Sequence, residues 1–187
     1  MTIETLMDSP PLEIWLEPAI APLDSWATTT AEAKEIQEAG RDQVITQDQF
    51  CGVDDIKTIA GVDVGFEDKG AIARAAVALL DFQSLEPLGV AIARVPTPFP
   101  YIPGFLSFRE IPAIVRALAK LTHQFPEPPD VIICDGQGYA HPRRFGLACH
   151  LGVLLDRPTL GAAKSRFIGE HRSEEHTSEL QSLTNLV

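Results

Sequence analysis

The sequence contains few cysteines and no cysteine motif. Its three cysteines, Cys51, Cys134 and Cys149, are far apart and form no C-x-x-C pair. A disulfide-stapled scaffold or a zinc site needs paired or closely spaced thiols, so neither is indicated. The cysteines are therefore expected to be core thiols in a reducing compartment.

Long apolar runs are also absent. No stretch of about 18 apolar residues occurs, so the sequence predicts no membrane-spanning helix. The N-terminus lacks the basic and apolar regions of a secretory signal. These two absences predict a cytoplasmic protein without a membrane partner.

Positive charge is missing from both ends of the chain. Residues 1–26 contain five acidic residues and no lysine or arginine, and residues 173–187 contain three acidic residues and again none. The net charge of −11 argues at first against a nucleic-acid partner. However, residues 27–172 hold 18 acidic against 15 basic residues, and six of the basic ones lie within residues 143–172. A local basic face is therefore still expected, because a phosphate backbone responds to the local field.

The chain length of 187 residues suits a single domain. Residues 1–25 are acidic, Pro-rich and aperiodic, which predicts a loosely attached extension. The folded domain is expected over residues 26–170. Residues 171–187 are polar and have no lysine or arginine after Arg172, so they are expected to form a disordered tail.

The order of the predicted elements indicates a mixed α/β fold. Thr29 and Glu32 resemble a capping box that opens a helix running to about Ile45. Residues 58–66, 71–82 and 87–95 are short apolar runs joined by turn-like spacers, as in antiparallel strands. A helix to about residue 125, a buried parallel strand at 131–134, a helix opened by Pro142 and a strand at 157–162 follow. The prediction is a central sheet of three antiparallel and then parallel strands, flanked by helices.

Three acidic residues occupy informative places in this order. Asp63 lies inside the first strand, Glu110 lies near the start of the helix after the third strand, and Asp135 ends the fourth strand. A carboxylate in a central strand is costly unless it is paired or binds a metal, and the carboxyl ends of parallel strands are common ligand sites. If the first and fourth strands are neighbours, the three groups can converge. All-oxygen ligands then favour Mg²⁺ or Mn²⁺.

Each acidic residue also has a purely structural alternative. Glu110 could complete a capping box with Ser107, although Pro112 would then fall in the helix interior. Asp135 could be a turn residue before a glycine. Asp63 could be the buried partner of Arg74 or Lys57.

Three motifs bring a family resemblance. The stretches GVDVGF (residues 61–66), PYIPGFLSFRE (100–110) and DGQGYAHPRRFGLACHLG (135–152) together resemble the endonuclease V family. The resemblance covers roughly residues 26–170 and implies a ribonuclease H-like fold, whose sheet has the strand order predicted above. Residues 171–187 do not resemble the family, so we expect a domain that is incomplete at its C-terminus and followed by a non-family tail.

The resemblance implies a metal-dependent endonuclease of the deoxyribonuclease V type that acts in DNA repair. Such enzymes cut the second phosphodiester bond 3′ to deoxyinosine and leave 3′-hydroxyl and 5′-phosphate ends. Asp63, Glu110 and Asp135 match the acidic metal ligands and catalytic residues, with Mg²⁺ as cofactor and Mn²⁺ as a substitute. The implied partner is inosine-containing DNA, and some members of the family act on RNA. A monomer is expected.

The same resemblance implies further site residues. The PYIPG segment corresponds to the family's wedge, whose prolines would stiffen a tip that fills the gap left by an extruded base. His141 and Lys164 are implied to assist catalysis, by proton transfer or phosphate contact and by stabilising negative charge. Without the resemblance, the wedge is a Pro-rich surface loop, His141 a structural histidine and Lys164 a surface lysine. The implied substrate-binding residues are Tyr101, Ile102, Pro103, Gly104, Gly136, Gly138 and Arg143.

Two other functions remain open from the sequence. A different ribonuclease H-like nuclease, such as a junction resolvase or an inosine-specific ribonuclease, would share the acidic residues but has no use for PYIPG before the helix. A nucleic-acid-binding remnant without catalysis is the second alternative, because the C-terminal part departs from the family.

Overall fold

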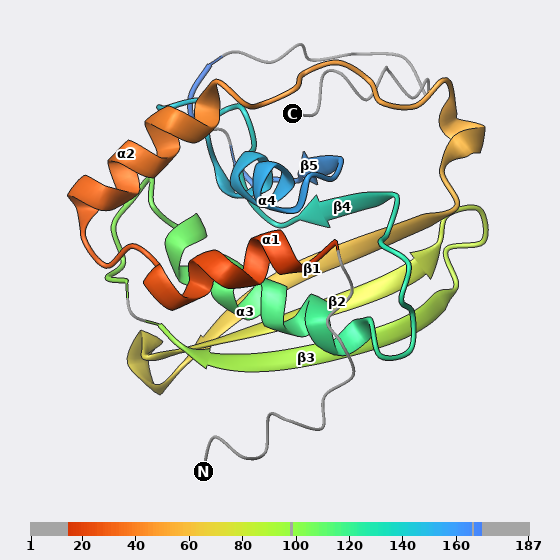
Figure 1. Cartoon of the computed structure of the whole chain (residues 1–187), viewed down its shortest axis with the longest axis horizontal. Coiled ribbons are helices and arrows are strands. Elements are labelled where there is room, and N and C mark those ends of the chain that lie inside the picture. The colour runs from red at the N-terminus through yellow and green to blue at the C-terminus, as the bar shows by residue number, and fades with distance from the viewer. Residues whose placement is uncertain (1–14, 98, 166, 170–187) are drawn as a thin grey trace.

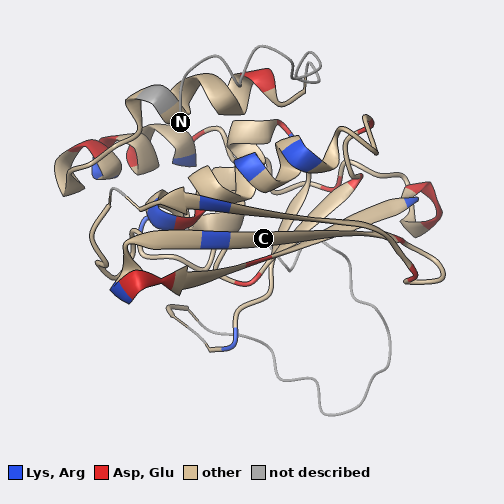
Figure 2. Cartoon of the chain, turned by 90° about the horizontal axis from the view of Figure 1, so that it is seen from below, with Lys and Arg blue, Asp and Glu red and all other residues tan. Residues whose placement is uncertain are grey.

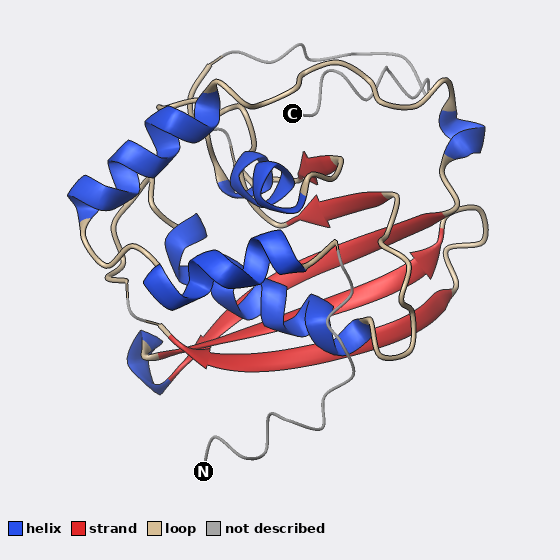
Figure 3. Ribbon diagram, in the orientation of Figure 1, coloured by secondary structure: helices blue, strands red, loops and turns tan. Residues whose placement is uncertain are grey.

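A five-stranded sheet organises the chain (Figures 1 and 3). The computed structural model describes residues 15–97, 99–165 and 167–169. The strands lie in the order β3-β2-β1-β4-β5. Their bounds are Thr58–Glu67 (β1), Ile72–Asp81 (β2), Pro87–Pro96 (β3), Val131–Cys134 (β4) and Thr159–Gly161 (β5).

The strand directions confirm the predicted fold class. β1 pairs antiparallel with β2, and β2 pairs antiparallel with β3. β4 lies parallel to β1 on its other side, and β5 lies parallel to β4. The sheet therefore consists of an antiparallel meander extended by two parallel strands, and its junction is the β1–β4 pair.

The helices pack on one face of this sheet (Figure 2). Residues of α1, α3 and α4 join a single apolar core with the inward side chains of the strands. The opposite face is apolar on β3 but open to solvent, with Leu88, Val90 and Ile92 exposed by 44%, 58% and 47%. The bounds of the helices are Glu17–Ile20 (α1), Thr30–Arg41 (α2), Ser107–Leu121 (α3) and Leu147–Leu155 (α4), with 3-10 turns at Ala21–Ser25 (η2), Val53–Asp55 (η3) and Asp68–Gly70 (η4).

The capping box of α2 is confirmed. The Thr29 hydroxyl accepts from the Glu32 amide, and the Glu32 carboxylate accepts from the Thr29 amide. The helix ends at Arg41, four residues before the predicted end at Ile45.

Residues 15–25 are part of the folded domain, which corrects the prediction of a loosely attached extension for this half of residues 1–25. Leu16 and Ala19 are fully buried in the core. The Trp15 indole donates to the Pro126 carbonyl beyond α3. Composition misled here because the prolines lie at the starts of α1 and η2, where a missing backbone N–H is tolerated. Residues 1–14 and 170–187, which include the predicted tail, lie outside the described residues.

Helix α3 contains Pro112 in its interior, and the backbone hydrogen bond lost there is replaced by one from Trp26. Pro112 has no N–H to donate to the carbonyl of Phe108, one turn earlier. The Trp26 indole donates to that carbonyl instead, at 2.8 Å. The helix therefore continues through Pro112 without leaving a buried acceptor unpaired.

Helix α4 begins later than predicted. Pro142 lies in a loop, and the helix starts at Leu147 after Gly146. Arg144 has a φ of 55°, a left-handed conformation that no α-helix contains. The chain from Asp135 to Gly146 is therefore a long loop at the end of β4, held closed by a hydrogen bond from the Gly146 amide to the Gly138 carbonyl.

Candidate active site

Asp63 and Asp135 occupy neighbouring positions on adjacent parallel strands. Val62 of β1 is the register partner of Cys134 of β4, and the two aspartates come directly after them. The Asp135 amide donates to the Val62 carbonyl at 3.3 Å, which continues the ladder by one residue. The sheet thus places two carboxylates side by side where β4 ends.

Glu110 approaches the two aspartates from α3. Its side chain is buried, and no described residue donates a hydrogen bond to its carboxylate. Burial raises the pKa of Glu110 to about 8, and the negative charges of Asp135 and Asp63 add to the shift. The three acidic residues therefore share one electrostatic neighbourhood, and Glu110 can exchange a proton near neutral pH.

Lys164 is the cation of this neighbourhood. Its Nζ lies 2.7 Å from Asp135 Oδ2. The hydrogen bond and charge of Asp135 raise the pKa of Lys164, and Asp63 contributes in the same direction. The lysine side chain is otherwise exposed, so its ammonium group can turn toward a substrate without a large desolvation cost.

The donor chemistry of the three acidic residues fits a hard divalent cation, but their spacing is wider than one ion requires. Among the described residues, no three His, Cys, Asp or Glu side chains lie close enough to hold one metal ion. Asp63 accepts a hydrogen bond from the Val64 amide, and Asp135 is engaged by Lys164. The oxygens of the buried Glu110 carboxyl group accept no hydrogen bond from a described residue, so they are available as ligands of a hard cation. The ligand set stays a prediction.

The structural alternatives for Asp63 and Glu110 do not apply in this geometry, whereas Asp135 does lie in a bend before Gly136. Arg74 pairs with Glu67, at 3.2 Å, rather than with Asp63. Lys57 donates from its Nζ to the Asp54 carbonyl. The N-cap of α3 is Leu106, without a side-chain cap, so Glu110 forms no capping box with Ser107.

A cavity of about 330 Å³ opens between the PYIPG loop and the loop after β4. Tyr101 at the tip is 72% exposed, whereas Phe105 at the base of the loop is buried. Of the predicted substrate-binding residues, Tyr101, Ile102, Pro103 and Gly104 line this cavity, and Gly136, Gly138 and Arg143 do not.

His141 has both ring nitrogens engaged. Nδ1 accepts from the Arg143 amide at 3.2 Å, so Nε2 carries the proton and donates to the Gly104 carbonyl at 3.1 Å. Burial and the charge of Arg143 lower the pKa of His141. The histidine is therefore neutral and holds two loops together, an arrangement that favours a positioning role over proton transfer.

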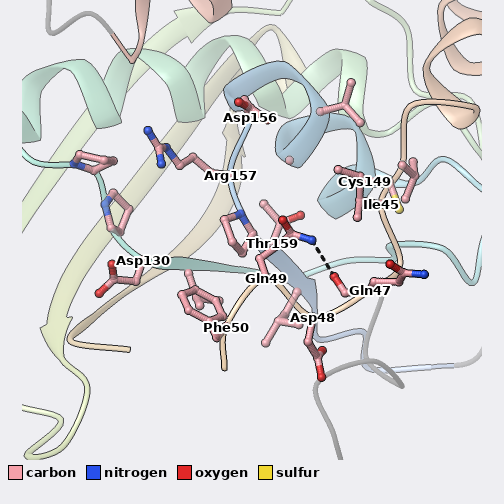
Figure 4. Close-up of a pocket in the computed structure, with 18 of the residues that line it drawn as sticks. Ile45, Gln47, Asp48, Gln49, Phe50, Asp130, Cys149, Asp156, Arg157 and Thr159 are labelled. Carbon is pink, nitrogen blue, oxygen red and sulfur yellow. Dashed lines mark hydrogen bonds between the residues drawn. The ribbon is translucent and has the colours of Figure 1, made fainter. Parts of the chain in front are cut away.

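The described basic residues of positions 143–172 do not form one patch. Arg143 is engaged with Gly104, and Lys164 with Asp135. Arg157 lines a separate cavity of about 440 Å³ (Figure 4). In Figure 2 the Lys and Arg residues are spread over several elements with acidic residues among them.

The cavity of Figure 4 is separate from the site formed by Asp63, Glu110 and Asp135. It lies between the α2–β1 connection, β5 and the end of α4, and none of the predicted site residues lines it. Asp130 at its edge accepts from the amides of Lys57 and Thr58, so this aspartate anchors the start of β1.

Sequence reasoning missed Gln37, which is 1% exposed and donates hydrogen bonds to both the PYIPG loop and the loop after β4. The available signal was its spacing from Ala33 and Gly40, which places a polar side chain on the buried stripe of α2. It also missed Arg109, which donates to the Phe99 carbonyl at the start of the PYIPG loop.

The fold and the site together define a class of protein. The sheet order, with an acidic residue in β1, a second in the helix after β3 and a third at the end of β4, is that of a ribonuclease H-like α/β protein. A model of the family "Endonuclease V" matches residues 38–187. The chain belongs to the endonuclease V family. The matched range includes residues 171–187, for which the sequence alone predicts a non-family tail.

Known relatives and structures agree with this assignment. The chain is 53% identical over 153 residues to Endonuclease V of Nostoc punctiforme, covering 82% of this chain and 66% of the relative. The crystal structure of Endonuclease V from Streptomyces avermitilis is 42% identical, with a TM-score of 0.66 over 75% of this chain and 59% of that one. Endonuclease V of Ciona intestinalis, in complex with a 24mer DNA containing an inosine followed by a ribo-adenosine, is 33% identical, with a TM-score of 0.68 over 72% of this chain and 57% of that one. The chain thus spans at most about two thirds of the length of these relatives. Among the described residues, no helix is long and apolar enough to cross a membrane.

Proposed function

We propose that this chain is a metal-dependent endonuclease that recognises inosine in DNA and hydrolyses the second phosphodiester bond on its 3′ side. The observation that carries the proposal is that Asp63 and Asp135 lie on neighbouring strands, close enough to Glu110 for their charges to add to the rise of its pKa caused by burial. Membership of the endonuclease V family supports the same substrate class.

The acidic residues would hold the cation. Asp63, Glu110 and Asp135 would supply carboxylate oxygens, which suit Mg²⁺ and also accept Mn²⁺. The bound cation would supply Lewis acidity toward the phosphoryl group. Binding requires Asp63 and Asp135 to exchange their present hydrogen-bond partners for the ion. Glu110 would lose its proton more readily once a positive charge neutralises its neighbours.

Lys164 would contribute positive charge at the phosphate. If Asp135 were a ligand of the cation, its ion pair with Lys164 would be given up, and the ammonium group would be available to the developing negative charge of the transition state. The lysine would act as a donor in both positions, because the ordinary pKa of a lysine, about 10.4, already keeps it protonated at neutral pH.

The cavity beside the PYIPG loop would receive the base. A pocket of about 330 Å³ is of the size that small ligands occupy, and it is bordered by the exposed ring of Tyr101. Tyr101 and Ile102 would occupy the space that the extruded nucleotide leaves in the duplex. Main-chain groups near Gly104, which lines this cavity, would contact the base edge, whereas Gly136 and Gly138 do not line it.

The proposal is tested with a duplex that carries one deoxyinosine and a label at either end. In Mg²⁺ the purified chain should nick only the inosine strand, one nucleotide beyond the inosine, and leave 3′-hydroxyl and 5′-phosphate ends. A matched duplex with deoxyadenosine, and the Asp63→Asn variant on the inosine duplex, should give no product. Equal cutting of both wild-type duplexes would instead indicate a different ribonuclease H-like nuclease.

A second candidate function is inosine recognition without cleavage. It is favoured by the spacing of the acidic residues, which do not yet form a metal-ligand cluster. In that case the chain binds the inosine duplex more tightly than the adenosine duplex but yields no product in Mg²⁺ or Mn²⁺. Substrates with a ribonucleotide after the inosine, and inosine RNA, distinguish a DNA from an RNA preference.

A further inference from the structure

We propose that Gln37 of α2 is a positioning residue that sets the PYIPG loop against the loop after β4 and thereby determines how well the chain discriminates inosine. This inference rests on the proposed function, because it concerns the same cavity. Figure 1 shows α2 beside the loop that leads into α3.

Every hydrogen-bonding group of the Gln37 amide serves one of the two loops. Its Nε2 donates to the Gly104 carbonyl at 3.0 Å and to the Phe145 carbonyl at 3.2 Å. Its Oε1 accepts from Arg143 Nε. Arg143 Nη2 and His141 Nε2 donate to the same Gly104 carbonyl, at 2.8 and 3.1 Å. The Gly104 carbonyl at the base of the PYIPG loop thus accepts from three donors. Gln37 contacts both this carbonyl and Arg143, one of the other donors.

The helix that carries Gln37 is fixed against the second loop. Gly40, one turn later, lies under the ring of Phe145, and a Cβ at this position would come within 2.4 Å of that ring. Helix α2 therefore packs against this loop so closely that only a glycine fits at position 40. Gln37 points inward because it lies on the buried face of α2, between Ala33 and Gly40.

The PYIPG loop is held at its other end by a different buried side chain. Arg109 of α3 donates to the Phe99 carbonyl at 3.0 Å and to the Gly70 carbonyl at 3.1 Å. Gly104 has a φ of 84°, so the chain turns sharply at the Gln37 end. The exposed tip with Tyr101 therefore lies between two anchors, and only the Gln37 anchor is shared with the loop after β4.

Gln37 also borders the cavity of about 330 Å³. Because its amide is saturated by protein groups, it has no donor left for a base. Its effect on recognition must therefore act through Gly104 and Arg143, by keeping the distance between the cavity walls constant.

The test compares Gln37→Met and Gln37→Glu with the wild-type chain. Gln43→Met is the matched control, because Gln43 is exposed just beyond α2 and its amide donates only to the Ala39 carbonyl. Affinities for the inosine duplex and the adenosine duplex are measured without divalent metal, well below the lowest unfolding midpoint. Hydrogen exchange of residues 99–106 and 139–146 is followed in the same samples.

Gln37→Met should reduce the inosine preference about tenfold while affinity for the adenosine duplex changes less than about twofold. Exchange should rise in the two loops but not in the sheet. Gln37→Glu retains an acceptor for Arg143, but its carboxylate cannot donate to the Gly104 and Phe145 carbonyls and would repel both oxygens. It should therefore lower the unfolding temperature and should not recover the preference. The control should match the wild type.

The proposal is overturned if Gln37→Met keeps the wild-type preference, or if Gln37→Glu restores it. A wild-type chain without any inosine preference refutes the proposed function itself. Even then the hydrogen-exchange measurement tests whether Gln37 positions the two loops. Unchanged exchange in both loops of Gln37→Met overturns that role independently of the proposed function.

Discussion

The ammonium group of Lys164 lies 2.7 Å from Oδ2 of Asp135, one strand away from Asp63. In the proposed reaction this lysine changes partner from carboxylate to phosphate. We expect Lys164→Gln to slow cleavage at inosine about 100-fold, as removal of a charge-stabilising donor does in other enzymes. Unfolding temperature should be unchanged, because the side chain is exposed. Lys34→Gln, on the exposed face of α2, is the control for lost charge in single-turnover assays. Equal rates for both variants would exclude a catalytic role for Lys164.

The buried charge of Glu110 should make stability depend on pH. Its folded-state pKa of about 8 lies above the ordinary value of 4.5. The folded chain therefore binds the proton more tightly, and the stability it gains is complete below pH 4.5 and lost as the pH rises through about 8. Because glutamine cannot ionise, Glu110→Gln should be more stable than the wild type by roughly 2–5 kcal/mol near pH 9.

Urea unfolding midpoints between about pH 5 and pH 9 measure this difference. Near pH 5 the two proteins should have similar midpoints. Mg²⁺ should raise the midpoint of the wild type at high pH and leave Glu110→Gln unchanged, because only the wild type has the proposed ligand. A wild-type midpoint that stays constant up to pH 9 would contradict a raised pKa of the buried Glu110 carboxyl.

His150 should destabilise the fold in acid. It is fully enclosed, with Nδ1 at 3.0 Å from the Ser107 hydroxyl, and burial lowers its pKa from 6.5 to about 3. Its contribution is complete above pH 6.5 and falls as the pH decreases toward 3, by roughly 1.4 kcal/mol per pH unit. His141 acts in the same direction. His150→Phe should lower the slope of the free energy of unfolding against pH by roughly 1.4 kcal/mol per pH unit between about pH 5 and pH 6.5, where Glu110 contributes a slope of opposite sign in both proteins. An unaltered slope in this variant would show that His150 does not titrate as described.

The Trp26 indole should matter only because of Pro112. Trp26→Phe leaves the Phe108 carbonyl without its donor and should cost about 1–3 kcal/mol. In a Pro112→Ala background, the substituted position regains an N–H that can donate to the same carbonyl. The same tryptophan substitution should then cost at least about 1 kcal/mol less, and a double-mutant cycle in urea measures the coupling. Additive effects would indicate that the indole stabilises the protein through ring packing alone.

The sequence predicted the order of strands and helices along the chain, because short apolar runs between turn signals are typical of strands, as in residues 131–134. The place of each strand in the sheet was implied by the family resemblance. The sequence placed the acidic residues correctly relative to the order along the chain, because strand ends and helix starts are local features. It missed what long-range contacts decide. Nothing near Pro112 indicates the indole of Trp26, and Gln37 is an ordinary polar residue until it meets a loop 67 residues away.

The prediction of where α4 begins was wrong for a related reason. Pro142 suits a first helical turn, but the conformation of Arg144 and the hydrogen bond between Gly146 and Gly138 keep the segment in a loop. The spacing of the acidic residues could not be predicted either. Side-chain directions depend on partners such as Lys164 and the Val64 amide, which compete with a metal for the same oxygens.

The outer surface of β3 affects how the protein behaves in concentrated solution. This strand lies at the margin of the sheet, ten residues long, with Leu88, Val90 and Ile92 facing water. The unpaired backbone groups of an edge strand can pair with the backbone of another molecule, and exposed apolar side chains beside them strengthen this association. Concentrated samples should therefore form ordered aggregates, and Val90→Lys should delay aggregation without altering the cavity beside the PYIPG loop, which Val90 does not line.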